Sequence, residues 1–130
     1  MSNGEKVKGL YEAAGRGDPG VLMAALHPAI EWSEAEGSPY AANNPYVGPG
    51  GVGMLLGQIA TDISDFRLEP HTFIDGGDVV VVQGRYRGVG AKTKKALDAP
   101  FAHVWSLRDG KVVRFQQYTD TRQWRDVLGD

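Results

Sequence analysis

The chain has 130 residues, 42% of them hydrophobic, which is enough for one compact domain with a core of its own. Its 14 basic and 16 acidic residues are interspersed and leave a net charge of -2, so no basic face is available to bind nucleic acid. The sequence contains no cysteine, which excludes disulfides, thiolate metal sites and cysteine nucleophiles.

The N-terminal segment carries charged residues where a signal peptide needs a continuous apolar core. No later segment approaches the roughly 20 apolar residues that span a bilayer. We therefore expect no membrane partner, a cytoplasmic location and a single domain over residues 1–130.

Two helices are predicted at the start of the chain. Apolar residues recur at helical spacing between residues 7 and 14, after Ser2 or Asn3 as the capping residue. Asp18 and Pro19 then mark the start of a second helix, because aspartate caps helices and proline suits the first helical position.

A short strand is predicted for residues 30–33 and a third helix for residues 52–60. Between them, residues 38–51 are too rich in Pro, Asn and Gly to form regular structure. This loop carries Tyr40 and Tyr46, whose aromatic rings need a surface to cover. We expect that surface to be either the mouth of a pocket or another subunit.

The second half of the chain changes to the period of β-strands. Turn signals at DGGD and RDGK punctuate runs of β-branched and aromatic residues. The four runs are FRLEPHTFI, VVVVQGRYRG, FAHVWSL and VVRFQQYT. The polar segment at residues 89–100 is predicted to connect the middle two. Helices followed by antiparallel strands indicate an α+β domain, with helices packed on one face of a curved sheet.

Several segments together resemble the nuclear-transport-factor-two-like superfamily, in its SnoaL-like and ketosteroid-isomerase-related branch. They are GLYEAAGRGDPGVLMAALHPAIEW, PYVGPGGV, FIDGGDVVVVQGRYRG and APFAHVWSLRDGKVVRFQQYTDT, in this order over nearly the whole chain. The resemblance implies a cone-shaped α+β fold. In it, N-terminal helices pack over the concave face of a curved, mixed sheet and enclose a mostly apolar pocket. It implies less about chemistry, because this fold hosts isomerases, cyclases, dehydratases, epoxide hydrolases and binding domains.

The last two strands can be paired in two ways. If Asp109 and Gly110 form a two-residue turn, His103 lies opposite Gln116 and shares a face with Asp120. That face carries Phe101, His103, Trp105, Leu107, Val112, Arg114, Gln116, Tyr118 and Asp120. A three-residue turn with Gly110 as a bulge places His103 and Asp120 on opposite faces instead. We favour the first pairing, because Asp-Gly is typical of two-residue turns.

Asp120 has two interpretations. It could cap a final helix, with Gln123 three residues later as the return partner. It could also be a pocket carboxylate, because the resemblance implies an acid/base aspartate near the end of this strand in SnoaL-like cyclases. Aromatic walls at Phe101, Trp105 and Tyr118 would then exclude water and make the carboxylate a better base. The two roles can coexist, and we favour the pocket.

His103 is the candidate partner of this carboxylate, as a proton shuttle or as a hydrogen-bond donor to a substrate carbonyl. The alternative is a core histidine bonded to the backbone. The three histidines of the chain have no ligand-like spacing, so we expect no metal and no other cofactor.

Glu34 is a second candidate carboxylate. It lies two residues after Trp32, so the two side chains face the same way if the strand continues. The alternative for Glu34 is a solvated acidic rim together with Glu31 and Glu36.

Ketosteroid isomerases resemble this segment and hold their general-base aspartate at about the position of Glu34, allowing one gap. Elsewhere the match fails. Their oxyanion-hole tyrosine corresponds to Leu10 rather than Tyr11, and their neutral aspartate corresponds to Ala102. Steroid isomerase chemistry is therefore not favoured.

We expect a protein that binds a small apolar molecule in a hydrophobic pocket. As an enzyme it would be an isomerase or cyclase that abstracts a proton next to a carbonyl of a polyketide-like compound or cyclic ketone. The predicted catalytic residues are Asp120, His103, Glu34 and Tyr118. The predicted substrate-binding residues are Trp32, Tyr40, Tyr46, Phe101, Trp105 and Gln116.

Three alternatives stay open. The pocket could sequester a hydrophobic ligand without turnover, or be vestigial in a protein that acts through its interfaces. An epoxide-hydrolase-like site needs two aspartates bridged by an arginine; Asp120 and Arg114 are present, but no second aspartate is evident. In each case we expect a homodimer through the outer sheet face, which would present Val104, Val113 and Phe115.

Overall fold

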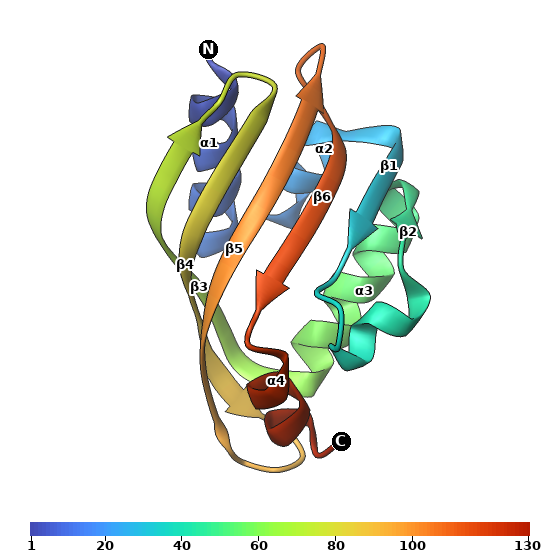
Figure 1. Cartoon of the computed structure of the whole chain (residues 1–130), viewed down its shortest axis with the longest axis vertical. Coiled ribbons are helices and arrows are strands. Elements are labelled where there is room, and N and C mark those ends of the chain that lie inside the picture. The colour runs from blue at the N-terminus through green and yellow to red at the C-terminus, as the bar shows by residue number, and fades with distance from the viewer.

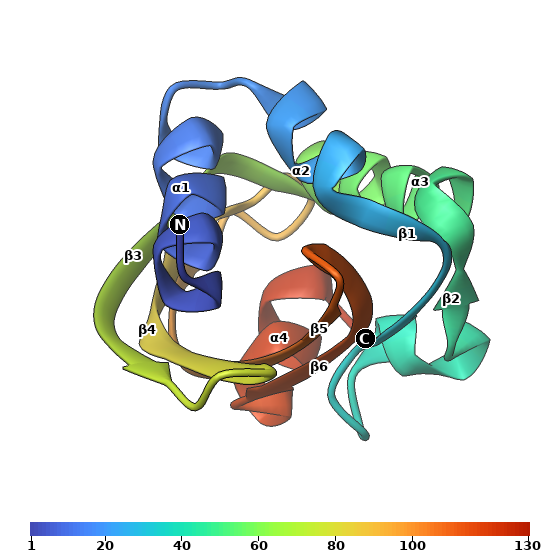
Figure 2. The same cartoon turned by 90° about the horizontal axis from the view of Figure 1, so that it is seen from above.

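Six strands form one curved sheet, and the α-helices α1, α2 and α3 lie across its concave side (Figures 1 and 2). The computed structural model describes residues 1–130. The helices are α1 (Asn3–Gly15), α2 (Pro19–Ala25), the 3-10 helix η1 (Pro39–Asn43), α3 (Gly48–Asp62) and α4 (Thr121–Leu128). The strands are β1 (Leu26–Ser33), β2 (Tyr46–Val47), β3 (Ile63–Asp75), β4 (Val79–Gly90), β5 (Ala96–Arg108) and β6 (Lys111–Thr119).

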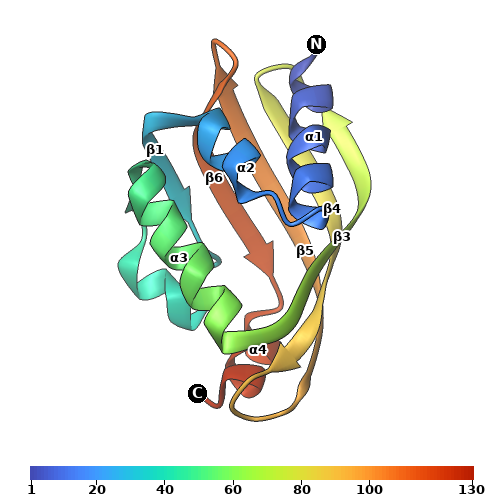
Figure 3. The same ribbon diagram turned by 180° about the vertical axis from the view of Figure 1, so that it is seen from behind.

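The sheet has the strand order β2-β1-β6-β5-β4-β3 and does not close into a barrel. Every neighbouring pair is antiparallel except β1 and β6, which are parallel. The sheet is therefore mixed, and the expected α+β fold is confirmed. Figure 3 shows α1, α2 and α3 from the helical side, with α4 at the narrow end of the molecule beside the C-terminus.

The helix starts follow the local sequence signals. Ser2 caps α1 in a capping box, in which its hydroxyl accepts from the Glu5 amide and the Glu5 carboxylate accepts from the Ser2 amide. Pro19 occupies the first turn of α2 as predicted, but the Asp18 side chain makes no capping hydrogen bond.

The predicted connection at residues 89–100 is shorter in the structure. Strand β4 continues to Gly90 and β5 begins at Ala96, so only residues 91–95 form the turn. The reason is the alternation in this segment: Leu97 is buried, whereas Asp98 faces outward and forms ion pairs with Arg85 and Arg87.

The turn of the last hairpin is the predicted one. Asp109 and Gly110 have φ values of 50° and 76°, as a two-residue hairpin turn of the I′ type requires, and Arg108 pairs with Lys111. The register then shifts, because Leu107 pairs with Val112 but Ser106 pairs with Arg114. Val113 is the extra residue, and it forms a β-bulge.

The bulge makes the predicted faces of β6 wrong. Beyond Val113, His103 lies opposite Gln117 instead of Gln116. Phe115 and Gln117 are buried on the concave side, whereas Gln116 and Tyr118 lie on the convex side. The outer face expected to form a dimer therefore lacks Phe115, of which only 2% is exposed.

The hydrophobic core lies between the concave face of the sheet and the helices, and 23 buried residues form it as one cluster. Helix α4 lies at the narrow end of the molecule, and its Trp124 and Val127 belong to this core. None of the helices is both long enough and apolar enough to cross a bilayer.

Candidate functional site

A cavity of about 140 Å³ lies inside the cone, lined by 16 residues of which 13 are hydrophobic. A cavity of about 150 Å³ can hold benzene, so the available space matches about one six-membered ring. The polar groups in the lining are few and belong to Tyr11, Glu34, Tyr86, His103 and Gln117, apart from the indole N–H groups. A small number of polar groups in an apolar wall is typical of a small-molecule site.

The cavity approaches the surface between the helices and β3. Most of its lining is buried, but Ala14 of α1 is exposed. Leu22 of α2, Leu56 of α3, and Phe66 and Leu68 of β3 are partly exposed. The side of the cavity nearest to solvent is therefore apolar.

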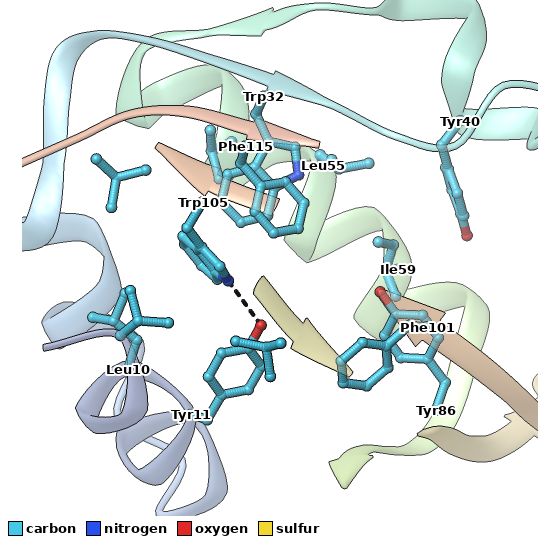
Figure 4. Close-up of a cluster of buried hydrophobic side chains, with 14 of the residues drawn as sticks. Leu10, Tyr11, Trp32, Tyr40, Leu55, Ile59, Tyr86, Phe101, Trp105 and Phe115 are labelled. Carbon is cyan, nitrogen blue, oxygen red and sulfur yellow. Dashed lines mark hydrogen bonds between the residues drawn. The ribbon is translucent and has the colours of Figure 1, made fainter. Parts of the chain in front are cut away.

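A network of hydrogen bonds runs along the cavity wall. His103 Nδ1 lies 2.5 Å from the Tyr11 hydroxyl, and its Nε2 lies 2.6 Å from the Tyr86 hydroxyl. Trp105 Nε1 donates to the Tyr11 oxygen at 2.9 Å, a bond drawn in Figure 4. At the other end Gln117 Nε2 donates to the Tyr86 oxygen at 2.5 Å. These residues come from α1, β4, β5 and β6, so the fold holds all of them.

Burial keeps the side chains of this hydrogen-bond network uncharged. It lowers the pKa of His103 to about 3, so the imidazole is neutral at physiological pH. It also raises the pKa values of Tyr11 and Tyr86, so both hydroxyls stay protonated. At neutral pH His103 can therefore take part in hydrogen bonds only as a neutral ring, and not as a charged imidazolium.

Glu34 lies inside the cavity wall and only 3% of it is exposed. It directly follows β1, where the Asn44 side chain accepts from the Glu34 amide at 2.9 Å and donates to its carbonyl at 2.8 Å. One carboxylate oxygen accepts from Trp32 Nε1 at 3.1 Å, and the other accepts no hydrogen bond from the protein. The alternative of a solvated acidic rim is therefore wrong for Glu34.

The surroundings of Glu34 make it a weak acid. Burial raises its pKa to about 7, although the hydrogen bond from Trp32 acts in the opposite direction. A carboxyl group with a pKa near neutrality can both accept and return a proton under physiological conditions.

Aromatic rings hold these polar groups in place. Trp32 and Phe115 stack with their ring centroids 3.8 Å apart, and Trp105 packs edge-on against both, as Figure 4 shows. Phe101 stacks on the His103 ring at 4.0 Å. Their packing leaves the polar side chains little freedom to rotate.

The structure contradicts the predicted position of Asp120. Its side chain is exposed and caps α4, where Oδ1 accepts from the Gln123 amide at 3.2 Å. Tyr118 is 57% exposed and, like Gln116, lies outside the cavity. The bulge at Val113 explains both differences, because the side chains of β6 that follow it lie on the opposite face of the sheet from the one predicted.

Tyr40 and Tyr46 do not line the cavity either. The Tyr40 hydroxyl donates to Asp62 Oδ2 at 2.7 Å, and the Tyr46 hydroxyl donates to the Tyr40 carbonyl at 2.6 Å. Tyr40 also packs edge-on against Trp124, which is part of the cavity wall. The two tyrosines therefore fix the loop against α3 and α4, and the predicted contact with substrate is not supported.

Four predicted residues do line the cavity: Trp32, Glu34, His103 and Trp105. Phe101 lies directly behind His103. Three polar residues of the cavity were missed by the sequence reasoning, namely Tyr11, Tyr86 and Gln117. Tyr11 carried a usable signal, since it belongs to the apolar stripe of α1, whereas Gln117 was assigned to the wrong face. The structure contains no cluster of three metal-ligating side chains.

Comparisons with known proteins agree with this architecture. An NTF2-like protein of unknown function from Burkholderia pseudomallei is 31% identical over the full length of both chains, with a TM-score of 0.89. TerC, solved with polyporic acid, is 28% identical over 97% of each chain, with a TM-score of 0.84. A proposed SnoaL-like polyketide cyclase from a Jannaschia species is 18% identical over 95% of this chain and 89% of its own, with a TM-score of 0.82, and shows the same fold. A search of curated proteins found no match. The family model for the SnoaL-like domain matches residues 7–115, and the chain belongs to this family.

Proposed function

We propose that this protein is an enzyme that moves a proton at the carbon next to a carbonyl group, in a small, cyclic and largely apolar ketone. The observation that carries the proposal is Glu34, a carboxyl group buried in the wall of an apolar cavity with one oxygen free of protein partners. With a pKa of about 7, Glu34 is matched to proton transfer near neutral pH.

The chemistry needs two kinds of group, and the cavity holds both. The Glu34 carboxylate takes a proton from the carbon next to the carbonyl, and negative charge develops on the carbonyl oxygen. A hydroxyl of Tyr11 or Tyr86 can donate a hydrogen bond to that oxygen, since both tyrosines line the same cavity. Protonated Glu34 can then return the proton to the same carbon or to another. Delivery to another carbon of a conjugated enolate is an isomerisation. In a cyclisation the enolate carbon would bond to a second carbonyl carbon of the same molecule, and protonated Glu34 would give its proton to the alkoxide oxygen that forms.

The comparisons support a small molecule as the partner. The SnoaL-like domain matches most of the chain, and TerC, a relative at 28% identity, was co-crystallised with polyporic acid. The epoxide-hydrolase alternative loses its support, because Arg114 and Asp120 are both exposed on the outside of the molecule. A non-catalytic ligand-binding protein stays as the second candidate, since the apolar cavity alone would suffice for it.

Hydrogen–deuterium exchange separates the two candidates. Cyclohexanone and a panel of other one-ring ketones would be incubated with the protein in D2O, and loss of the protons next to the carbonyl followed by NMR. We expect exchange faster than in buffer, and a loss on the order of 100-fold or more in Glu34→Gln. Glu36→Gln is the matched control, because Glu36 is exposed two residues further along. Equal exchange in wild type and Glu34→Gln would overturn the proposal, and binding without any exchange would favour the non-catalytic alternative.

A further inference from the structure

The hydrogen bonds of His103 leave one hydrogen atom of the three residues without an acceptor. Two contacts join the ring to Tyr11 and Tyr86, and each contact needs one hydrogen between its two heavy atoms. The neutral ring carries one N–H and each tyrosine carries one O–H, so three hydrogens are available for two contacts. Whichever ring nitrogen is protonated, the tyrosine on that side accepts from it and keeps its own hydroxyl hydrogen unused.

The tyrosine with the unused hydrogen can only donate. If His103 is protonated on Nδ1, the Tyr11 oxygen accepts from both that N–H and Trp105. If it is protonated on Nε2, the Tyr86 oxygen accepts from both that N–H and Gln117. Both lone pairs of the hydroxyl are then occupied. No other protein acceptor lies within hydrogen-bond distance of either hydroxyl, and both residues face the cavity.

We propose that Tyr11, His103 and Tyr86 form a switchable donor site for an acceptor oxygen of the ligand, in which the ring tautomer of His103 selects the tyrosine that donates. When the ring proton moves from Nδ1 to Nε2 and the two hydroxyls rotate to match, the hydroxyl that is free to donate changes from Tyr11 on α1 to Tyr86 on β4. The site therefore recognises one carbonyl or enolate oxygen at either of two places in the cavity. The two tyrosines offer no acceptor to a group that can only donate, such as an ammonium.

The ligand class follows from the site. It is a compound of about one ring, apolar except for a carbonyl oxygen that accepts the tyrosine hydrogen. This inference deepens the proposed function and rests on it only in taking the cavity as the substrate site. Its test measures tautomers and binding without turnover, so it can fail or succeed independently of exchange by Glu34.

The tautomers can be measured directly by ¹⁵N NMR of protein labelled at histidine. In Tyr11→Phe the Nδ1 side has no partner, so the proton should move to Nε2, where Tyr86 accepts it. In Tyr86→Phe the proton should move to Nδ1, where Tyr11 accepts it. Each variant keeps one tyrosine with a free hydroxyl hydrogen. Tyr40→Phe is the matched control, because the Tyr40 hydroxyl bonds Asp62 away from the cavity and should leave the tautomer unchanged.

Binding supplies the second readout. Cyclohexanone and methylenecyclohexane have similar shapes, but only the ketone accepts a hydrogen bond. We expect wild type and both single variants to prefer the ketone by roughly three- to tenfold, as one net hydrogen bond provides. The same tautomer in both single variants would overturn the proposal. So would loss of the preference in either of them. Circular dichroism would establish that each variant is folded before either result is read.

Discussion

Replacing Glu34 by glutamine should stabilise the protein at high pH and lose that advantage at low pH. Glu34 is buried, and its pKa lies near 7 instead of its ordinary 4.5. In the unfolded chain the carboxyl ionises freely above pH 4.5, whereas in the folded protein ionisation is opposed up to about pH 7. Stability from this group is therefore complete below pH 4.5 and is lost as the pH rises through 7.

The size of the effect follows from the pKa values. Each unit of pKa corresponds to about 1.4 kcal/mol, so a rise from 4.5 to about 7 costs the folded state about 3 kcal/mol once the carboxyl is ionised. Glutamine keeps the size and an oxygen that can accept from Trp32, but it does not ionise. Any fixed cost of burying its amide N–H groups is the same at both pH values and cancels in the comparison.

Urea unfolding at pH 5 and pH 8 would measure this difference. The free energy of unfolding of Glu34→Gln, taken relative to wild type, should be about 2 to 3 kcal/mol more favourable at pH 8 than at pH 5. Glu36→Gln should show no such change, because Glu36 is exposed. A relative stability of Glu34→Gln that does not depend on pH would refute the account of Glu34 as a desolvated carboxyl.

Two further predictions concern the outer surface. Asp120→Ala should lower the free energy of unfolding by about 1 kcal/mol through loss of the α4 cap, and Asp120→Asn by less, with no change in ketone exchange in either. A 100-fold drop in exchange for Asp120→Asn would instead return Asp120 to the catalytic residues. We also expect a homodimer through the convex sheet face around Val104 and Val113, so light scattering at micromolar concentration should give the mass of two chains and Val104→Arg the mass of one. A single-chain mass for the wild type would remove this expectation.

Local signals in the sequence predicted the parts of the fold that local interactions determine. The cap of the first helix, predicted at Ser2 or Asn3 and found at Ser2, and the two-residue turn at Asp109 and Gly110 each depend on a few neighbouring residues. The order of helices and strands likewise follows from the change of hydrophobic period along the chain. These features are all present in the structure.

The faces of β6 could not be predicted in this way. The bulge at Val113 is set by how β6 pairs with β5 on one side and, in parallel, with β1 on the other. A single inserted residue exchanges the two faces of everything that follows, so the error reached Gln116, Tyr118 and Asp120 together. The resemblance to SnoaL-like cyclases favoured the same wrong face for Asp120.

The direction of Glu34 agrees with its spacing, because it faces the same way as Trp32 two residues earlier and both line the cavity. The contact that holds it could not be predicted: Glu34 lies just beyond β1, and the Asn44 side chain bonds both its backbone amide and its carbonyl.

Tyr86 lies on the same buried face of β4 as Val80 and Val82, so strand alternation carried a usable signal for it. Gly84 on this face is needed for close packing, because a side chain there would clash with the Glu69 carbonyl oxygen and lie 2.8 Å from the Phe101 ring.

The two ionisable groups of the cavity are shifted in opposite directions by the same cause. Burial raises the pKa of Glu34 to about 7 and lowers that of His103 to about 3, so between these values both are neutral. A ketone can then enter without displacing water from a charge. Proton abstraction, however, needs the carboxylate, whose fraction grows as the pH rises through 7 while both tyrosine hydroxyls stay protonated. The burial that makes Glu34 a useful base thus lowers the stability of the fold at the pH where the base is active.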